Sequence, residues 1–474
     1  MSGQAAQDRK LEFYGGEWVS FLPFAIFIAL IVLTTFIWGS ISDGALWVPA
    51  FLALLLPFFA AKDKQYYSEV IIDGMASREA LIPVVCWLFA GVFSRVLRES
   101  GLAGSIAGVA ADAGLNGTWF TIVTFVASAV FATASGTGFG TIAAAMGVLY
   151  PAGVILGCNP ALMAGVIISG AAFGDNLAPI SDTTICSATS QGVDVPGVVR
   201  SRLKYAAVAA AITIAMIFVI DKFQTPVNGV TSTYTYKPDA LAMLFAVLVT
   251  IWIAVKTGDI IIATVIGTVL GSLIGLAFGL FDFIQVHPGE GALPALIRVH
   301  GEGLGRTVDG ILYTGLNSML QVAVLALLLF GSISIMRRGG GDLKLLNALS
   351  RVSNTATSAE LIVSIMVIVL SSLMGLHAPA ILAVGASFAK PLAQKFNISP
   401  YRMANILDAQ SNTLCYAVPW SPAVVYTISF AAGTSAPLSG IQVTPYVLYG
   451  YILLVVMTAS IFLGIGRRDG LENA

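Results

Sequence analysis

Two carboxylates lie among hydroxyl and amide groups inside an apolar part of the sequence. The stretch FGDNLAPISDTT directly follows the apolar run ALMAGVIISGAA, and its polar residues are Asp175, Asn176, Ser181, Asp182, Thr183 and Thr184. Ligand sets made only of oxygen suit hard cations such as Na⁺. A carboxylate whose pKa is raised by burial or by a neighbouring charge can instead carry a proton. The residue types therefore predict a site for a cation, a proton or both in turn, with Asp175 and Asp182 as the Na⁺ ligands.

The depth of this stretch decides whether it is a functional candidate. A charged aspartate costs about 2.5–3.5 kcal/mol at the centre of a membrane, so a carboxylate placed there calls for a functional explanation. The alternative is an ordinary loop outside the membrane. Apolar residues continue through the stretch at Ile180, Ile185 and Cys186, which favours a position at membrane depth.

A second polar cluster lies in the segment ILDAQSNTLCYAVPWSP. Asp408, Ser411, Asn412 and Thr413 precede its Pro-Trp-Ser break, and the Ser-Asn-Thr run lies between apolar stretches. We expect all four residues to contribute to binding. The alternative for Asp408 is an ion pair near the membrane surface with Arg402, which precedes it closely in the chain.

A third stretch, FATASGTGFGT, carries Ser135 and Thr137 among small residues. Small residues let membrane helices approach closely, so the stretch can serve packing alone. It can equally line a binding site, and the sequence favours neither reading.

The elements that carry these clusters are membrane helices. Of the 474 residues, 57% are hydrophobic and only 10% are charged, whereas soluble domains are roughly 25% charged. Apolar windows long enough to cross a bilayer core of about 30 Å recur along the chain. The sequence therefore predicts an all-α polytopic membrane protein. No enzyme, cofactor or nucleic-acid partner is expected, because the chain lacks a dense basic tract and a metal or nucleophile constellation.

Fourteen membrane-crossing units are expected, two of them interrupted. The interrupted units cover 160–190 and 400–430, and the others cover 21–38, 45–60, 81–98, 117–134, 137–156, 204–221, 238–256, 258–280, 311–336, 357–375, 377–396 and 443–466. If the N-terminus is cytoplasmic, eighteen Lys and Arg residues fall on the cytoplasmic side, Arg202 and Arg402 among them, and six fall outside. This bias follows the positive-inside rule. We therefore expect a plasma (inner) membrane protein with both termini in the cytoplasm.

The two interrupted segments correspond under a shift of 240 residues. The shift aligns three pairs of prolines and one pair of serines: Pro151 and Pro391, Pro160 and Pro400, Pro179 and Pro419, Ser181 and Ser421. Seven crossings per copy is an odd number, so the second copy enters the membrane with opposite polarity. We expect two inverted-topology repeats, residues 1–222 and 238–474, joined by a linker over 223–237. The alternative is coincidence in an apolar chain.

These motifs are similar to those of the NhaC family of sodium/proton antiporters. GDNLAPISDTT resembles the family signature Gly-Asp-Lys-x-Ser-Pro-x-Ser-Asp-Thr-Thr, and SGTGFGT resembles its Thr-Gly-Thr-Ser-Trp-Gly-Thr stretch. The segment from Asp408 to Ser421 resembles a second polar stretch of the family. The resemblance implies an ion transporter built from inverted repeats, with an ion site that includes Asp175, Ser181, Asp182, Thr183 and Thr184.

Three positions depart from the family pattern. Asn176 stands where the family has lysine, Ala178 where it has serine, and Ser421 where it has asparagine. The lost lysine changes the charge of the site, and relatives of the family exchange organic acids or move amino acids. The resemblance therefore indicates the transport class more firmly than it indicates the cargo.

Two transport functions follow. The leading one is a Na⁺/H⁺ antiporter that works in the lipid bilayer by alternating access, with Na⁺ and H⁺ as its partners. The alternative is a Na⁺- or H⁺-coupled carrier of a small organic solute, such as an organic acid or an amino acid. A channel is disfavoured because no repeated filter motif is visible. A homodimer is a possible assembly, and the insertion at 281–310 has no functional interpretation.

Overall fold

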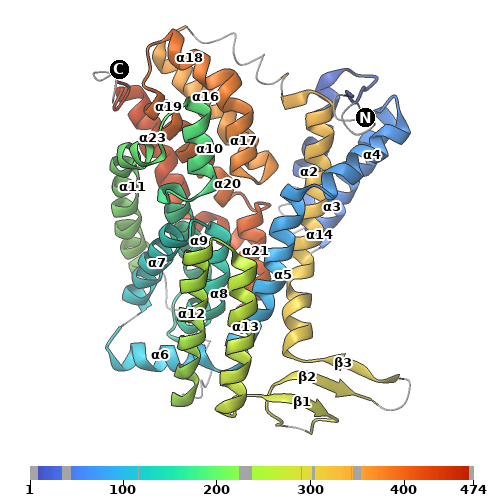
Figure 1. Cartoon of the computed structure of the whole chain (residues 1–474), viewed down its shortest axis with the longest axis vertical. Coiled ribbons are helices and arrows are strands. Elements are labelled where there is room, and N and C mark those ends of the chain that lie inside the picture. The colour runs from blue at the N-terminus through green and yellow to red at the C-terminus, as the bar shows by residue number, and fades with distance from the viewer. Residues whose placement is uncertain are drawn as a thin grey trace.

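The computed structural model describes residues 9–31, 33–34, 44–115, 117–223, 237–289, 291–301, 305–342, 344 and 354–468. Helices make up most of this part of the chain, and one small sheet lies at an end of the molecule (Figure 1). Ten of the described helices are long and apolar enough to cross a membrane, and a bent pair adds an eleventh. The predicted helical, polytopic class is confirmed.

The first part of the chain is helical throughout its described ranges. Its elements are η1 (Glu17–Phe21), α2 (Leu22–Ile31), α3 (Gly44–Leu55), η3 (Leu56–Ala60), α4 (Lys64–Met75), α5 (Arg78–Glu99), α6 (Leu102–Asp112), α7 (Gly117–Ser135), α8 (Gly138–Ile155), α9 (Pro160–Leu177), α10 (Asp182–Gln191) and α11 (Val195–Phe223).

The second part begins with η4 (Pro238–Ala242), α12 (Met243–Thr257) and α13 (Ile260–Ala277). Three strands and a long helix follow, namely β1 (Asp282–Val286), β2 (Ala295–His300), β3 (Thr307–Asp309) and α14 (Ile311–Arg338). The remaining elements are α16 (Ala356–Met374), α17 (His377–Val384), η6 (Gly385–Ala389), α18 (Lys390–Lys395), α19 (Pro400–Ser411), α20 (Leu414–Ala417), α21 (Pro422–Ala432), α22 (Gly440–Val443), η7 (Thr444–Tyr446) and α23 (Leu448–Leu463).

Three of the twelve crossing units that were expected to be uninterrupted do not form one long helix in the described ranges. The unit at 45–60 divides into α3 and η3, and the unit at 21–38 is described only in part. The unit at 377–396 divides into α17, the π-turn η6 and α18. Gly385 starts this π-turn where the chain passes close to Ser190, and a Cβ at that position would lie 2.6 Å from the Ser190 Cβ. Local π-turns of this kind widen a helix without ending it.

The insertion at 281–310 forms a sheet that was not predicted. Its strand order is β1-β2-β3, with β1 parallel to β2 and β2 antiparallel to β3. The strands DFIQV and ALIRVH are rich in β-branched and aromatic residues, which suit a pleated surface. The sheet lies at the end of the molecule where α14 begins (Figure 1).

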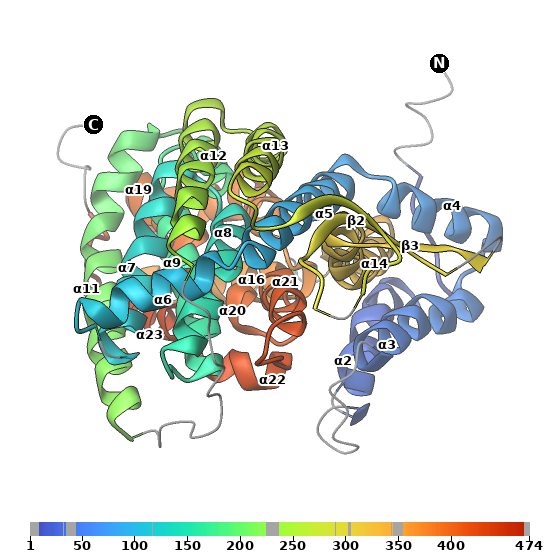
Figure 2. The same ribbon diagram turned by 90° about the horizontal axis from the view of Figure 1, so that it is seen from below.

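The helices divide into two groups around α5. Seen from the sheet side, α2, α3, α4 and α14 lie together on one side, and α7, α9, α11, α19 and α23 lie on the other (Figure 2). The span that contains α9 and α10 is the most enclosed of the candidate spans, with 89% of its apolar window buried. It is therefore surrounded by protein, which is where irregular backbone at membrane depth is tolerated.

Small residues bring α9 into close contact with α7. A Cβ at Gly170 would lie 2.7 Å from the Phe125 carbonyl oxygen, and one at Gly174 would lie 2.6 Å from the Ala132 carbonyl carbon. Both distances are too short for a real Cβ atom, so glycine is required at each position. This packing fixes α9 against α7 directly before Asp175.

Candidate functional site

The first interrupted segment is a helix broken at Pro179, as the sequence predicts. α9 ends at Leu177, α10 begins at Asp182, and the caps Ala178 and Ser181 have extended backbone with ψ of 125° and 139°. Proline has no N–H and hinders continuation of a helix. The C-terminus of α9 and the N-terminus of α10 therefore both lie at this break.

The second interrupted segment repeats this backbone geometry 240 residues later. Val418 and Ser421 have extended backbone with ψ of 143° each, and α21 begins directly after Ser421. A one-turn helix, α20, lies between the end of α19 and this break. α9 and α10 run toward the end of the molecule opposite the sheet, whereas α19, α20 and α21 run the other way (Figure 1). α10 packs beside α19.

Asp175 lies at the first break as a buried carboxylate, with 5% of its surface exposed. Its two oxygens accept hydrogen bonds from Ser181 Oγ at 2.9 Å and from the Tyr416 hydroxyl at 3.0 Å. Tyr416 belongs to α20, so Asp175 connects the two broken segments. No Lys, Arg or His of the described residues lies within ion-pair distance of Asp175. An isolated buried charge is costly, so this carboxylate favours a bound proton or a bound cation.

Asp408 in α19 has the opposite environment. It is fully buried and forms an ion pair with Arg202 of α11. Asn412 Nδ2 donates to Asp408 Oδ1 at 2.8 Å. The sequence offered Arg402 as an alternative ion-pair partner of Asp408. This alternative is wrong, because Arg402 instead forms an ion pair with Glu360 at 3.2 Å.

The Arg202 side chain contacts residues at both breaks. Its Nη1 donates to the carbonyl of Asn176 and to Thr184 Oγ1, the latter at 3.2 Å. Its Nε donates to Asn405 Oδ1 at 3.2 Å. The sequence placed Arg202 before the helix expected at 204–221. This placement is wrong, because α11 begins at Val195 and includes Arg202 as a fully buried residue.

The other predicted residues of the first break divide by exposure. Ser181 Oγ also lies 2.9 Å from Thr183 Oγ1, and both side chains are buried. Asp182 is exposed in the first turn of α10. Asn176 is buried and donates to the Tyr449 hydroxyl at 3.1 Å. Asp175 and Asp182 therefore stand on opposite sides of the break, one enclosed and one accessible.

The predicted residues of the second break mostly bond to their own backbone. Ser411 Oγ donates to the Asp408 carbonyl at 2.8 Å, and Thr413 Oγ1 donates to the Gln410 carbonyl at 2.6 Å. The Asn412 amide holds the Asp408 carboxylate. These contacts shape the end of α19 around Asp408.

The third stretch provides a turn against the first break. A Cβ at Gly136 would lie 3.0 Å from Ile180 Cδ1, so the turn between α7 and α8 touches the residue after Pro179. Ser135 is buried there. Thr137 caps α8 by accepting from the Gly140 amide at 3.3 Å, which is a structural role.

Several buried polar atoms near the breaks have no hydrogen-bond partner within the described part of the chain. They are Ser135 Oγ, Asn176 Oδ1, Arg202 Nη2, Gln410 Oε1, Gln410 Nε2 and Asn412 Oδ1. A buried polar group left unpaired costs about 1–3 kcal/mol. Four of these six atoms are oxygens, and oxygens are the ligands that hard cations prefer.

Sequence reasoning missed three residues of this site: Arg202, Tyr416 and Tyr449. Arg202 looked like a charge at a helix entrance, because the helix was expected to begin at residue 204. The two tyrosines lie on elements about 240–270 residues from their partners. No local pattern could have linked them to Asp175 and Asn176.

Oppositely directed, broken membrane helices with buried carboxylates at the breaks are typical of secondary transporters. The model of the Na⁺/H⁺ antiporter family matches residues 16–222 and 205–466. The chain therefore belongs to this family, and it is a membrane transporter rather than an enzyme. The resemblance to the NhaC family is confirmed.

Two curated relatives show the range of the similarity. The chain is 22% identical over 429 residues to the Na⁺/H⁺ antiporter NhaC of Alkalihalophilus pseudofirmus, covering 85% of this chain and 87% of that protein. It is 29% identical over 201 residues to the malate-2H⁺/Na⁺-lactate antiporter of Bacillus subtilis. That second match spans 42% of each protein, less than half the length of the relative.

Among solved structures, the chain is similar to the YdaH transporter of Alcanivorax borkumensis. The match has a TM-score of 0.43 and 13% sequence identity, and it covers 94% of this chain and 98% of that chain.

Proposed function

We propose that this protein exchanges Na⁺ for H⁺ across the plasma membrane by alternating access. The observation that carries the proposal is Asp175, a buried carboxylate at a helix break that has only hydroxyl donors for partners. A carboxylate in this setting can accept a proton or a cation, and occupancy by one excludes the other. Mutual exclusion at one carboxylate is the simplest basis for exchange.

The proposed ion path uses both aspartates of the first break. Asp182 is exposed and attracts the cation, and Asp175 holds it after entry. Ser181, Thr183 and the Tyr416 hydroxyl supply further oxygens near Asp175. The N-terminus of α10 faces the same break, and its partial positive charge limits how tightly a cation is held.

We also propose that the chain consists of two inverted repeats over 1–222 and 238–474, with seven membrane units in each. The support is the matching of helix starts under the 240-residue shift. Asn159 and Ser399 both cap helices that begin with proline, at Pro160 and Pro400. In this arrangement both termini are cytoplasmic, and the sheet lies outside the cell.

The central experiment measures proton movement in proteoliposomes. Purified protein is reconstituted around a pH-sensitive dye, and a Na⁺, Li⁺ or K⁺ gradient is applied. We expect an outward Na⁺ gradient to drive H⁺ inward and acidify the lumen, and we expect Asp182→Asn to reduce this movement strongly. Absence of Na⁺-driven pH change in active, oriented vesicles would overturn the proposal, and full activity of Asp182→Asn would overturn its role.

A second candidate function is coupled transport of a small organic acid. The observation in its favour is Arg202, a buried guanidinium beside both breaks whose Nη2 has no partner among the described residues. A guanidinium is well suited to a carboxylate ligand. The Bacillus subtilis relative is named for malate and lactate, which gives the first compounds to test. Uptake of labelled malate or lactate, with and without a Na⁺ gradient, decides between the two candidates.

A further inference from the structure

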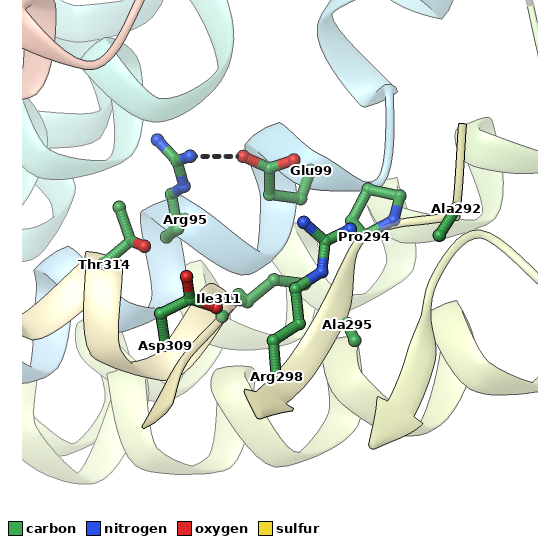
Figure 3. A pocket seen from close by; sticks show the side chains of 10 residues that line it. Arg95, Glu99, Ala292, Pro294, Ala295, Arg298, Asp309, Ile311 and Thr314 are labelled. Carbon is green, nitrogen blue, oxygen red and sulfur yellow. Dashed lines mark ion pairs between the residues drawn. The ribbon is translucent and has the colours of Figure 1, made fainter. Parts of the chain in front are cut away.

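A polar cavity lies outside the two helix breaks, where α5 ends and the sheet meets α14. Its volume is about 180 Å³. Arg95 and Glu99 line it from α5, while Arg298 and Asp309 line it from the sheet (Figure 3). Thr314 on the second turn of α14 adds a hydroxyl. Four charged side chains, two from α5 and two from the sheet, thus converge on a space that the transport proposal does not use.

Within the described ranges, the charges around this cavity are not evenly matched. Arg95 pairs with Glu99 at 2.6 Å, and Asp309 pairs with His300 at 3.1 Å. Arg298 has no carboxylate within ion-pair distance among those residues; it donates only to Gln285 Oε1 and to the Leu293 carbonyl. Its Nη1 group has no bond to the described residues. Among the described residues, the Arg298 guanidinium therefore lines the cavity without a carboxylate partner.

The second arginine of the lining, Arg95, uses one Nη atom for Glu99 and places its guanidinium at the same cavity. A carboxylate is the small anion whose two oxygens match guanidinium N–H groups in direction and spacing. The carboxylates of Glu99 and Asp309 stand nearby as acceptors, so they suit a hydroxyl or ammonium group on the same ligand.

The cavity volume limits the size of the ligand. A cavity of about 150 Å³ holds a molecule of benzene size, so this one suits about six to ten non-hydrogen atoms. We infer that the cavity is a binding site for a small organic carboxylate that also bears a hydroxyl or an ammonium group. The inference concerns a site separate from the helix breaks, and it holds whichever cargo the protein moves.

The site also contacts one of the broken helices. Arg98, one turn after Arg95, donates to the Phe430 carbonyl in the last turn of α21 at 2.7 Å. A Cβ at Gly433 would lie 3.1 Å from Arg95 Nη1, so Arg95 itself reaches the end of α21. A ligand that binds Arg95 therefore acts on the helix whose other end forms the second break. Binding at this site is expected to change the transport rate.

Calorimetry on the full chain in nanodiscs tests the site with four probes: lactate, malate, alanine and acetate. We expect lactate, malate or alanine to bind more tightly than acetate, which lacks the second polar group. Arg298→Gln should weaken binding by about tenfold or more, because it removes the charged partner. Arg306→Gln is the matched control, since it removes an exposed positive charge directly before β3 of the same sheet. It should leave the affinity unchanged.

A second variant guards against a folding defect, because Arg298 also holds the Leu293 carbonyl. Ala292→Phe places a large side chain in the cavity from an exposed position, and Ala292 makes no side-chain hydrogen bond that would be lost. It should also abolish binding. Asp175→Asn should leave binding intact, which separates this site from the helix breaks. Absence of binding by all four probes at millimolar concentration, or equal affinity in wild type, Arg298→Gln and Ala292→Phe, would overturn the inference.

Discussion

The two helix breaks share a backbone but differ in charge. Ser181 and Ser421 occupy the same position after a proline, and their ψ values differ by only a few degrees. Asp175 at the first break has no cation from the described protein beside it, whereas Asp408 near the second is paired with Arg202. The Asp175 carboxylate is therefore available to a transported ion, whereas the Asp408 carboxylate is already paired with Arg202.

This difference suits the two carboxylates to different roles, Asp175 to ion binding and Asp408 to holding the helices together. A mobile ion needs a carboxylate that is unpaired in the protein, and this requirement costs stability in the unloaded state. A fixed ion pair can instead hold helices together at the same depth. Because Arg202 also contacts the Asn176 carbonyl and Thr184, it connects the second break to the first. The following predictions test whether the two carboxylates differ in this way.

The largest effect is expected from Asp175→Asn. The change should abolish Na⁺-driven proton movement, because the site loses its buried negative charge. Thermal stability should stay the same or rise, since a buried charge without a protein partner is removed. Dye-based flux and a thermal melt of the same preparation measure both quantities. A melting temperature that falls together with the flux would point to a structural role for Asp175.

The second prediction concerns the Arg202–Asp408 pair. Arg202→Met or Asp408→Leu alone should destabilise the protein by about 3–5 kcal/mol, because each leaves a buried charge unpaired. The double variant should recover much of this loss. Chemical or thermal unfolding in nanodiscs gives the double-mutant cycle. Additive losses in the double variant would show that the two side chains do not act as a pair.

The third prediction uses a pair of glycines with left-handed backbone. Gly136 (φ 68°) touches Ile180 at the first break, whereas Gly157 (φ 79°) has open space around it. Alanine at either position should cost about 1–2 kcal/mol of stability from backbone strain. Only Gly136→Ala should also slow transport, because it displaces Ile180. Equal flux in the two variants would separate this turn from the ion site.

The smallest effects are expected at the two equivalent serines. Ser421 caps α21 by accepting from the Val424 amide at 3.1 Å, so Ser421→Ala should cost about 1 kcal/mol of stability. Ser181 has no such cap bond and donates to Asp175 instead. Ser181→Ala should therefore alter the apparent Na⁺ affinity more than stability. The reverse pattern in melting and flux assays would contradict the assignment.

Local chemistry made part of this structure predictable. Pro179 and Pro419 locate both breaks, because proline interrupts a membrane helix regardless of what surrounds it. The apolar windows located eleven of the crossing helices in the described ranges. The sheet was missed because a membrane chain is read first for helices, although its strands carry a clear β-branched pattern.

The charge pairing of the site was not predictable. Near a helix start, Arg202 has the same local sequence context as a surface charge, and only the packing of α11 on α19 shows its burial. The sequence offered Arg402 as a partner for Asp408 because the two are close in the chain, but Arg402 turns to Glu360 on α16. Nearness in the chain is a weak guide to ion pairs between helices.

The glycine contacts between α7 and α9 set the size of the moving part. Gly170 and Gly174 place α9 directly on the α7 backbone, and such close-packed surfaces shift as a unit rather than deform. Any displacement of Asp175 must then carry α7 with it, so the smallest rigid body in the transport cycle contains two helices. Cysteine cross-links between α7 and α9 would accordingly be silent in flux.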